Sequence, residues 1–123
     1  MDKIKSFRDL VVWQRAVDLA VLIYRTTEQF PKSEMYGLTN QMRRASVSVA
    51  SNIAEGYNRS QAKLRHFLEI ARGSLAELET QLEIAQRIGF LPLPDHAALL
   101  EEINILGRQL NVFYQRVDAT LNR

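Results

Sequence analysis

The feature that most constrains the fold is a run of leucine and alanine residues between Gln61 and Gly89 that recurs at alternating steps of four and three positions. This heptad spacing lines up the side chains along one side of an α-helix and favours shallow, left-handed packing against neighbouring helices. A second run with the same alternation, except for its last step of four, follows Pro94. The two runs are Leu64, Leu68, Ala71, Leu75, Leu78, Leu82 and Ala85, and Leu99, Ile103, Leu106, Leu110, Phe113, Val117 and Leu121. No alternating strand pattern competes with them, so the chain is predicted to be all-α.

Glycine and proline residues are few and cluster at three places, which divide the chain into four segments long enough for extended helices. Each segment has a candidate N-terminal cap. These caps are Ser6, which forms a capping-box pattern with Asp9, and Ser33, Ser60 and Asp95; candidate ends are Phe30-Pro31, Gly56-Tyr57-Asn58 and Gly89. Because short connections make consecutive helices antiparallel, we expect an up-down-up-down four-helix bundle that forms a single domain over residues 1–123.

The first two predicted helices differ in the width of their apolar surface. In the first, over about residues 7–29, two apolar rows lie side by side, so this helix is expected to contact two neighbours. The rows are Leu10, Trp13, Val17, Val21 and Tyr24, and Val12, Ala16, Leu19, Ile23 and Phe30. The second helix has one narrow stripe that should face the core, formed by Leu38, Met42, Ala45, Val49 and Ile53.

Composition and charge indicate the cellular compartment of the protein and the kind of partner that it can bind. The 123 residues include no cysteine, which excludes disulfides and thiolate metal sites and suits a reducing cytoplasm. No apolar run approaches the roughly 20 residues of a membrane span, and the opening MDKIKSFRDL lacks the apolar core of a secretory signal, so we expect a cytoplasmic protein. Although the formal net charge is only +2, residues 1–72 carry 12 Lys/Arg against 7 Asp/Glu. Such asymmetry is compatible with a basic face that meets an acidic partner such as RNA.

Signatures of enzymes are absent from the sequence. There is no phosphate-cradling glycine loop, no nucleophile elbow and no Glu-x-x-His pair of the kind that builds di-iron sites in bundles. The two histidines, His66 and His96, have no second histidine at i+4, so a surface role is favoured over metal binding. We therefore expect a protein without catalytic residues, metal or other cofactor.

A polar ribbon runs along the second predicted helix, where Gln41, Arg44, Ser48, Asn52, Glu55 and Arg59 fall within about 80° of one another in projection. One interpretation is a solvated face with i,i+4 pairs such as Glu55 with Arg59. The other is a surface between subunits, because small residues would let another helix approach closely and a buried polar ribbon would fix the register. The candidate assembly or structural motif is Gln41, Arg44, Ser48, Asn52, Glu55 and Gly56.

Cationic residues concentrate on the second helix and the start of the third, with Tyr57 in the turn between them. Lysine and arginine contacts to a phosphate backbone are independent of base sequence and sensitive to salt, and an exposed tyrosine could stack on an unpaired base. A structural role for Tyr57 in the turn is the alternative. The candidate nucleic-acid-binding residues are Arg43, Arg44, Arg59, Lys63, Arg65 and Arg72.

Three stretches of the chain share a pattern with one protein family: FRDLVVWQRAVDLAVLIY, RRASVSVASNIAEGYNR and FLEIARGSLAELETQLEIAQRIGFL. Together they resemble the four-helix-bundle proteins encoded in intervening sequences of bacterial 23S ribosomal RNA genes, which carry a ribosomal-protein-like label. The pattern includes Trp13, the Gln41–Arg44 segment, Asn52 to Gly56, and Arg72-Gly73-Ser74-Leu75 with Glu77 and Leu78. The last predicted helix has generic heptad sequence, so the resemblance rests on the first three.

The resemblance implies a small bacterial cytoplasmic bundle that forms a ring-shaped homopentamer. It also implies a distant similarity to the accessory proteins of diversity-generating retroelements, which bind nucleic acid and a reverse transcriptase. Our first hypothesis is a non-enzymatic oligomeric scaffold that binds RNA or DNA through basic residues. The alternative is a protein-interaction module that recruits a partner protein, with no role for nucleic acid. A third hypothesis, an enzyme using Glu55 with Arg44 and Asn52, lacks a recognisable nucleophile or oriented base.

Overall fold

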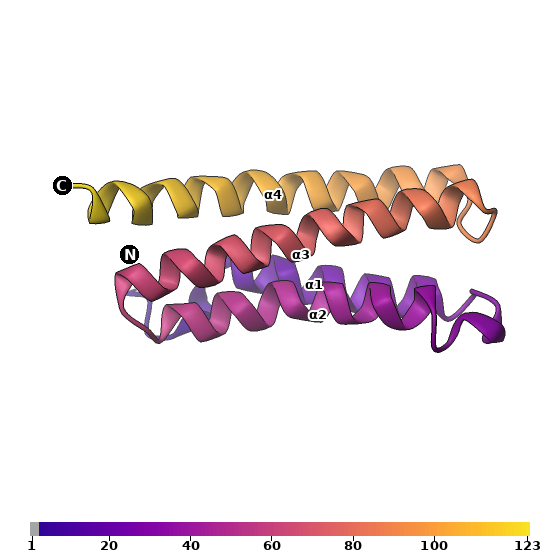
Figure 1. Cartoon of the computed structure of the whole chain (residues 1–123), viewed down its shortest axis with the longest axis horizontal. Coiled ribbons are helices and arrows are strands. Elements are labelled where there is room, and N and C mark those ends of the chain that lie inside the picture. The colour runs from indigo at the N-terminus through magenta and orange to yellow at the C-terminus, as the bar shows by residue number, and fades with distance from the viewer. Residues whose placement is uncertain (1–2) are drawn as a thin grey trace.

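Four long helices run up and down along one direction, and the two ends of the chain lie at the same end of the bundle (Figure 1). The computed structural model describes residues 3–123, so residues 1 and 2 of the predicted domain lie outside it. The helices are α1 (Val11–Thr27), α2 (Leu38–Tyr57), α3 (Gln61–Arg87) and α4 (Leu93–Leu121), with short 3₁₀ turns at Phe7–Asp9 and Lys32–Glu34. The predicted all-α, up-down four-helix architecture is confirmed.

Helix α3 is the centre of the packing. It contacts α2 along its length on one side and α4 on the other, whereas α1 packs chiefly on α2 and less on α4 (Figure 1). Every residue of the heptad run predicted for α3 is buried, because both neighbours cover that side. In the run on α4, the residues from Leu99 to Leu110 and Val117 are buried. Phe113 and Leu121, nearer the C-terminal end of the helix, are partly buried.

One of the two apolar rows on α1 is buried in the core, whereas the other only borders it, with Leu10, Trp13 and Val17 partly buried against the core. Val12, Ala16, Leu19, Ile23 and Phe30 are buried, whereas Val21 and Tyr24 of the other row are exposed. The second row instead forms one wall of an apolar groove between α1 and α2, of about 660 Å³, whose opposite wall includes Val47, Ala50 and Ala54. The predicted contact of α1 with two neighbours, α2 and α4, is correct.

The predicted ends are right at Ser60 and Gly89 and wrong at Ser33 and Asp95. Ser6 caps a 3₁₀ turn and not the first long helix, which runs over Val11–Thr27 instead of about residues 7–29. Ser6 forms its capping box with Asp9, Ser60 Oγ accepts from the backbone N–H of Lys63, and Gly89 adopts φ +87° just after α3. The capping box closes only a 3₁₀ turn, because Leu10 is extended and α1 begins after it.

Both wrong caps lie in connections where the chain turns before the helix starts. Ser33 lies inside the 3₁₀ turn, and the non-helical backbone of Gly37 separates that turn from α2. In the second connection, Pro92 precedes α4 and Pro94 occupies its first turn, where a missing N–H costs no hydrogen bond. Asp95 is therefore a first-turn acid that favours the helix dipole rather than a cap.

Candidate functional site

The polar ribbon of α2 lines a groove between α2 and α3. The groove has a volume of about 370 Å³ and is lined by Gln41, Arg44, Ala45, Ser48, Ser74, Glu77 and Gln81. The three α3 residues follow one another at steps of three and four, which places them on a single side of that helix. The structure therefore brings three residues of the predicted α2 motif, Gln41, Arg44 and Ser48, together with a polar row of α3.

Several polar side chains of the ribbon are paired by hydrogen bonds within the chain. The hydroxyl oxygens of Ser48 and Ser74 lie 2.8 Å apart across the two helices, and either can be the donor. Asn52 Nδ2 donates to the Ser48 carbonyl at 2.8 Å and to Ser48 Oγ at 3.0 Å. Glu55 pairs with Arg59 at i+4, as one interpretation of the sequence predicted. These contacts fix the middle of the ribbon and the end nearest the α2–α3 turn.

The other end of the groove holds unpaired polar groups. Gln81 is only 8% exposed, and its Oε1 is buried without a hydrogen-bond partner among residues 3–123. On the two rims, Arg44 of α2 and Glu77 of α3 are exposed, and neither makes an ion pair in the described chain. A buried amide oxygen without a donor costs about 1–3 kcal/mol, so this end of the groove can gain from a further contact.

Gly56, the last member of the predicted motif, has a steric role. It is buried where α2 crosses the start of α3, and a Cβ built on it would lie 2.8 Å from Phe67 Cβ and 3.1 Å from Leu64 Cδ1. The first contact is shorter than real Cβ atoms tolerate. Gly56 thus allows the close approach of α2 to the start of α3, next to the turn that joins the two helices.

The six predicted nucleic-acid-binding residues do not lie on one face. Arg43 turns toward α1, where its Nε donates to Thr27 Oγ1 at 2.9 Å and its guanidinium lies 4.7 Å from the centre of the Tyr24 ring. Arg65 and Arg72 turn toward α4 on the opposite side. Arg59 is paired with Glu55 and lies over the Phe67 ring. Arg44 and Lys63 are exposed and make no ion pair within residues 3–123.

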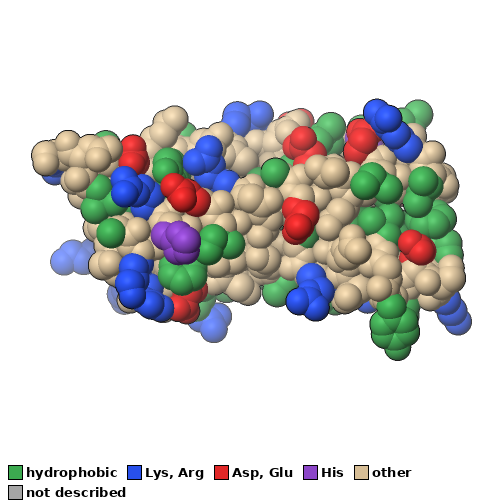
Figure 2. Space-filling model, in the orientation of Figure 1, with side chains coloured by type: hydrophobic (Ala, Val, Ile, Leu, Met, Phe, Trp, Pro, Cys, Tyr) green, Lys and Arg blue, Asp and Glu red, His purple; other side chains and the backbone are tan. Residues whose placement is uncertain are grey.

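The surface charge has the same dispersed character. Figure 2 shows Lys and Arg side chains interspersed with Asp and Glu on the viewed face, without a continuous basic area. Tyr57, proposed as a stacking platform or a structural residue, is partly buried at the end of α2. The predicted cations therefore divide among three sides of the bundle.

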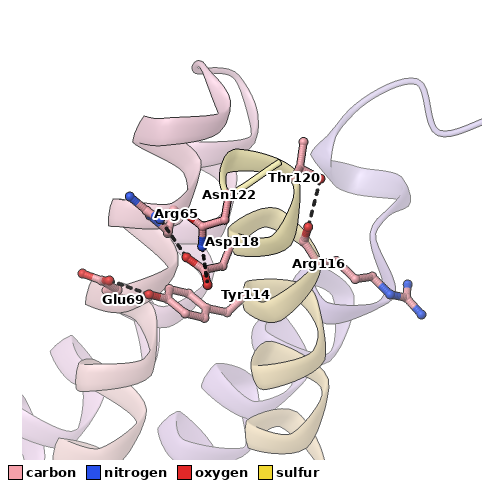
Figure 3. A network of polar contacts seen from close by, with 7 residues as sticks. All are labelled: Arg65, Glu69, Tyr114, Arg116, Asp118, Thr120 and Asn122. Carbon is pink, nitrogen blue, oxygen red and sulfur yellow. Dashed lines mark hydrogen bonds and ion pairs between the residues drawn. The ribbon is translucent and has the colours of Figure 1, made fainter.

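The side between α3 and α4 carries a polar network that the sequence analysis did not identify as a site. Arg65 pairs with Asp118 at 2.7 Å, and the Tyr114 hydroxyl donates to Glu69 Oε1 at 2.7 Å (Figure 3). The hydrogen bond to Glu69, together with partial burial, raises the pKa of Tyr114, and the bond to Asp118 raises the pKa of Arg65. Sequence spacing could have suggested these pairs only if the α3–α4 register were known.

The same side continues toward the α3–α4 turn. Glu83 accepts a hydrogen bond from Arg87 at 2.7 Å, which lowers the pKa of Glu83, and His96 Nε2 lies 3.6 Å from the second Glu83 oxygen. His66 is exposed and packs edge-on against Phe67. Within residues 3–123, no three His, Cys, Asp or Glu side chains gather in a way that could hold a metal ion. None of the described helices is long and apolar enough to cross a membrane.

The comparisons with known proteins agree on one relationship. The model of a family described as 23S rRNA-intervening sequence protein matches residues 8–112. A crystal structure of a protein of unknown function from the S23 ribosomal protein family of Bacteroides thetaiotaomicron VPI-5482 covers 85% of this chain and 98% of its own, with a TM-score of 0.76 and 21% identity. At that identity the likeness shows a common fold. No curated protein matches the sequence.

Proposed function

We propose that this chain, which belongs to the 23S rRNA-intervening sequence protein family, is a non-enzymatic binding protein that assembles with copies of itself through the α2/α3 groove. The observation that carries the proposal is the unpaired end of that groove, where the buried Gln81 oxygen lacks a donor between the free rims formed by Arg44 and Glu77. A second copy of the chain can satisfy all three groups.

Charge complementarity supports a second copy as the occupant. The rims carry one positive and one negative side chain, so the surface is complementary to itself: Arg44 of one subunit can pair with Glu77 of the next. Apolar side chains lie on the same side of α3, because Ile70 and Ile84 are seven positions before and after Glu77. Both are more than one-third exposed. Their burial would add a hydrophobic contribution that the monomer lacks.

A charge-reversal experiment tests this assembly. We expect the wild type to have an oligomeric mass by light scattering on size-exclusion chromatography, and that mass decides whether the ring-shaped pentamer implied by the resemblance forms. Arg44→Glu and Glu77→Arg should each weaken association at least tenfold, because like charges then face each other across the contact. The double variant should restore association to within about threefold of the wild type, since the pair is re-formed in reverse.

Lys32→Glu is the matched control, because Lys32 is exposed in the 3₁₀ turn before α2 and outside the groove. It should leave the mass unchanged. A wild-type chain that stays monomeric at all concentrations would contradict the assembly. So would a double variant as dissociated as the single variants, because the loss would then come from general disruption of the surface.

Association with RNA or DNA is the second candidate function. The observation that favours it is that Arg44 and Lys63, on the side of the α2/α3 groove, are exposed and make no ion pair within residues 3–123. Arg59, at the α2–α3 turn, adds a third cation whose charge is partly offset by its pair with Glu55. Arg65 and Arg72 are engaged with α4 and Arg43 with α1, so their contribution to a polyanion contact on this side is smaller.

Neutralising Arg59, Lys63 and Arg65 together tests this candidate. Binding to a structured RNA should weaken, and the slope of log affinity against log salt should fall by about 1 to 2, because Lys63 is free whereas Arg59 is paired with Glu55 and Arg65 with Asp118. The oligomeric mass should not change. Unchanged RNA affinity, or wild-type binding that tolerates high salt, would leave the protein-partner alternative as the better one.

Catalysis plays no part in the proposal. The hypothetical catalytic group Glu55 is held by Arg59 instead of by Arg44 or Asn52, and Asn52 is bound to Ser48. No nucleophile and base with an orienting partner occur together among the residues that line the groove. The proposal also assigns the protein to the cytoplasm, since a chain without cysteine suits a reducing compartment.

A further inference from the structure

A pocket of about 330 Å³ interrupts the contact between α3 and α4 midway along the two helices. On one side of it lies the network of Arg65, Glu69, Tyr114 and Asp118 (Figure 3), and toward the α3–α4 turn lies the Glu83–Arg87 pair. Five polar side chains converge on the pocket from the two helices, and none of them makes an ion pair within residues 3–123. They are Arg72, Glu79, Asn104, Arg108 and Asn111.

The pocket is open because small residues line it from both helices, Ala76 on α3 and Gly107 on α4. Gly107 lies inside a 29-residue helix, where glycine is the least favourable residue apart from proline. Packing does not require it, because a Cβ at this position would meet only Leu75 Cδ2 at 3.6 Å, an ordinary contact. The space beside Gly107 is therefore not accounted for by the packing of the monomer.

Arg72 is held in an orientation suited to binding an anion. Its guanidinium lies 4.6 Å from the centre of the Tyr114 ring. The Tyr114 hydroxyl is fixed by its hydrogen bond to Glu69 (Figure 3). A guanidinium supported on a ring keeps its N–H donors free in the plane of the group. No acceptor within the described chain takes them. Tyr114 thus positions Arg72 with its forked donors free for a ligand.

We propose that this pocket binds a phosphate group that is attached to a hydroxyl-bearing sugar, as in a nucleoside monophosphate or one nucleotide of an RNA strand. Arg72 and Arg108 contact the phosphate oxygens, since guanidinium groups bind phosphate through paired hydrogen bonds. Glu79 and the Asn104 amide accept hydrogen bonds from the sugar hydroxyls. The negative charge of Glu79 disfavours a bare polyphosphate. The pocket volume is at the lower end of small-ligand sites, about 300–1,000 Å³.

Calorimetric titration with AMP, adenosine and inorganic phosphate tests the site in the full chain. AMP should bind at least tenfold more tightly than either fragment, because only AMP presents both groups. Arg72→Gln and Arg108→Gln should each weaken AMP binding about tenfold or more, as expected for loss of a charged hydrogen bond. Arg87→Gln, an exposed arginine outside the pocket, is the control and should bind AMP like the wild type.

Substitutions at Tyr114 and Gly107 test whether binding also needs the positioning of Arg72 by the ring and the open space beside Gly107. Tyr114→Phe keeps the ring under Arg72 and should bind AMP within about threefold of the wild type, whereas Tyr114→Leu should weaken binding about fivefold. Gly107→Ala should raise the melting temperature and weaken AMP binding, because the added methyl group favours the helix and narrows the pocket. Loss of binding in Gly107→Ala cannot come from misfolding if the variant melts at a higher temperature.

A short single-stranded RNA, with and without a 5′-phosphate, identifies the source of the phosphate. Binding of both AMP and RNA that is abolished in Arg72→Gln supports the pocket as a nucleotide site, and RNA binding that needs the 5′-phosphate indicates a strand end. Inorganic phosphate that binds as tightly as AMP would overturn the sugar contacts. Failure of both AMP and RNA to bind, or RNA binding unaffected by Arg72→Gln and Arg108→Gln, would overturn the site. The pocket lies on the opposite side of α3 from the assembly groove, so its failure leaves the proposed assembly untouched.

Discussion

Replacing Leu78 with alanine is expected to lower the free energy of unfolding by about 2–5 kcal/mol, because the substitution leaves a cavity that the bundle cannot fill by collapse. Leu78 is fully buried at the middle of the heptad run on α3, the helix that contacts both α2 and α4. Chemical denaturation followed by circular dichroism measures the loss. A reduction of this size is a large fraction of the total stability of a domain of this length.

Leu93→Ala is the matched control for Leu78→Ala. Leu93 is 65% exposed at the first position of α4, so the same substitution there should change the free energy of unfolding by less than about 0.5 kcal/mol. Equal effects of the two substitutions would contradict the assignment of α3 as the centre of the core.

Gly56→Ala is the second substitution with a large expected effect, a loss of about 1–3 kcal/mol of unfolding free energy. Alanine normally favours a helix over glycine, but here the added methyl group would collide with Phe67 Cβ at 2.8 Å. Because that atom is attached directly to the α3 backbone, α2 and α3 must move apart. Denaturant unfolding measures the loss, and the Ser48–Ser74 contact should lengthen in a structure of the variant.

Gly73→Ala is the control for the Gly56 variant. Gly73 lies inside α3, and a Cβ at this position would meet nothing within 4 Å among the described residues. The substitution should stabilise the chain by up to about 1 kcal/mol through helix propensity alone. Stabilisation by Gly56→Ala of the same size would contradict the steric role assigned to Gly56 at the α2–α3 contact.

Sequence reasoning located the α2 side of the candidate groove and missed its α3 side. Gln41, Arg44, Ser48 and Asn52 stood out because polar and small residues follow helical spacing there. Ser74, Glu77 and Gln81 follow the same rule on α3, but the strong leucine run on that helix predicted only its core side, and Ser74 and Glu77 were noted only as part of the family pattern. The pairing of Ser48 with Ser74 depends on the axial register of two helices, which their separate patterns do not define.

The positions of the cationic residues in the sequence did not predict which of them share a surface. Clustering along the sequence suggested one basic surface, yet successive helix positions differ by about 100°, so neighbours such as Arg43 and Arg44 point to different sides. The direction in which each cation turns then depends on partners from other helices: Thr27 and Tyr24 for Arg43, Asp118 for Arg65, and the Tyr114 ring for Arg72. None of these partners is near in sequence.

The sequence by itself determined the four helices, their order, their antiparallel connections and the sides of α2, α3 and α4 that face the core. These features follow from local signals, because periodic apolar residues, capping groups and glycine or proline breaks act within one helix or one turn. The tertiary structure alone decided which apolar row of α1 enters the core, which arginines are taken up by neighbours, and where a pocket stays open between α3 and α4. Those outcomes depend on side chains that meet across helices from distant parts of the chain, and each is set by small differences in packing and pairing that no single helix contains.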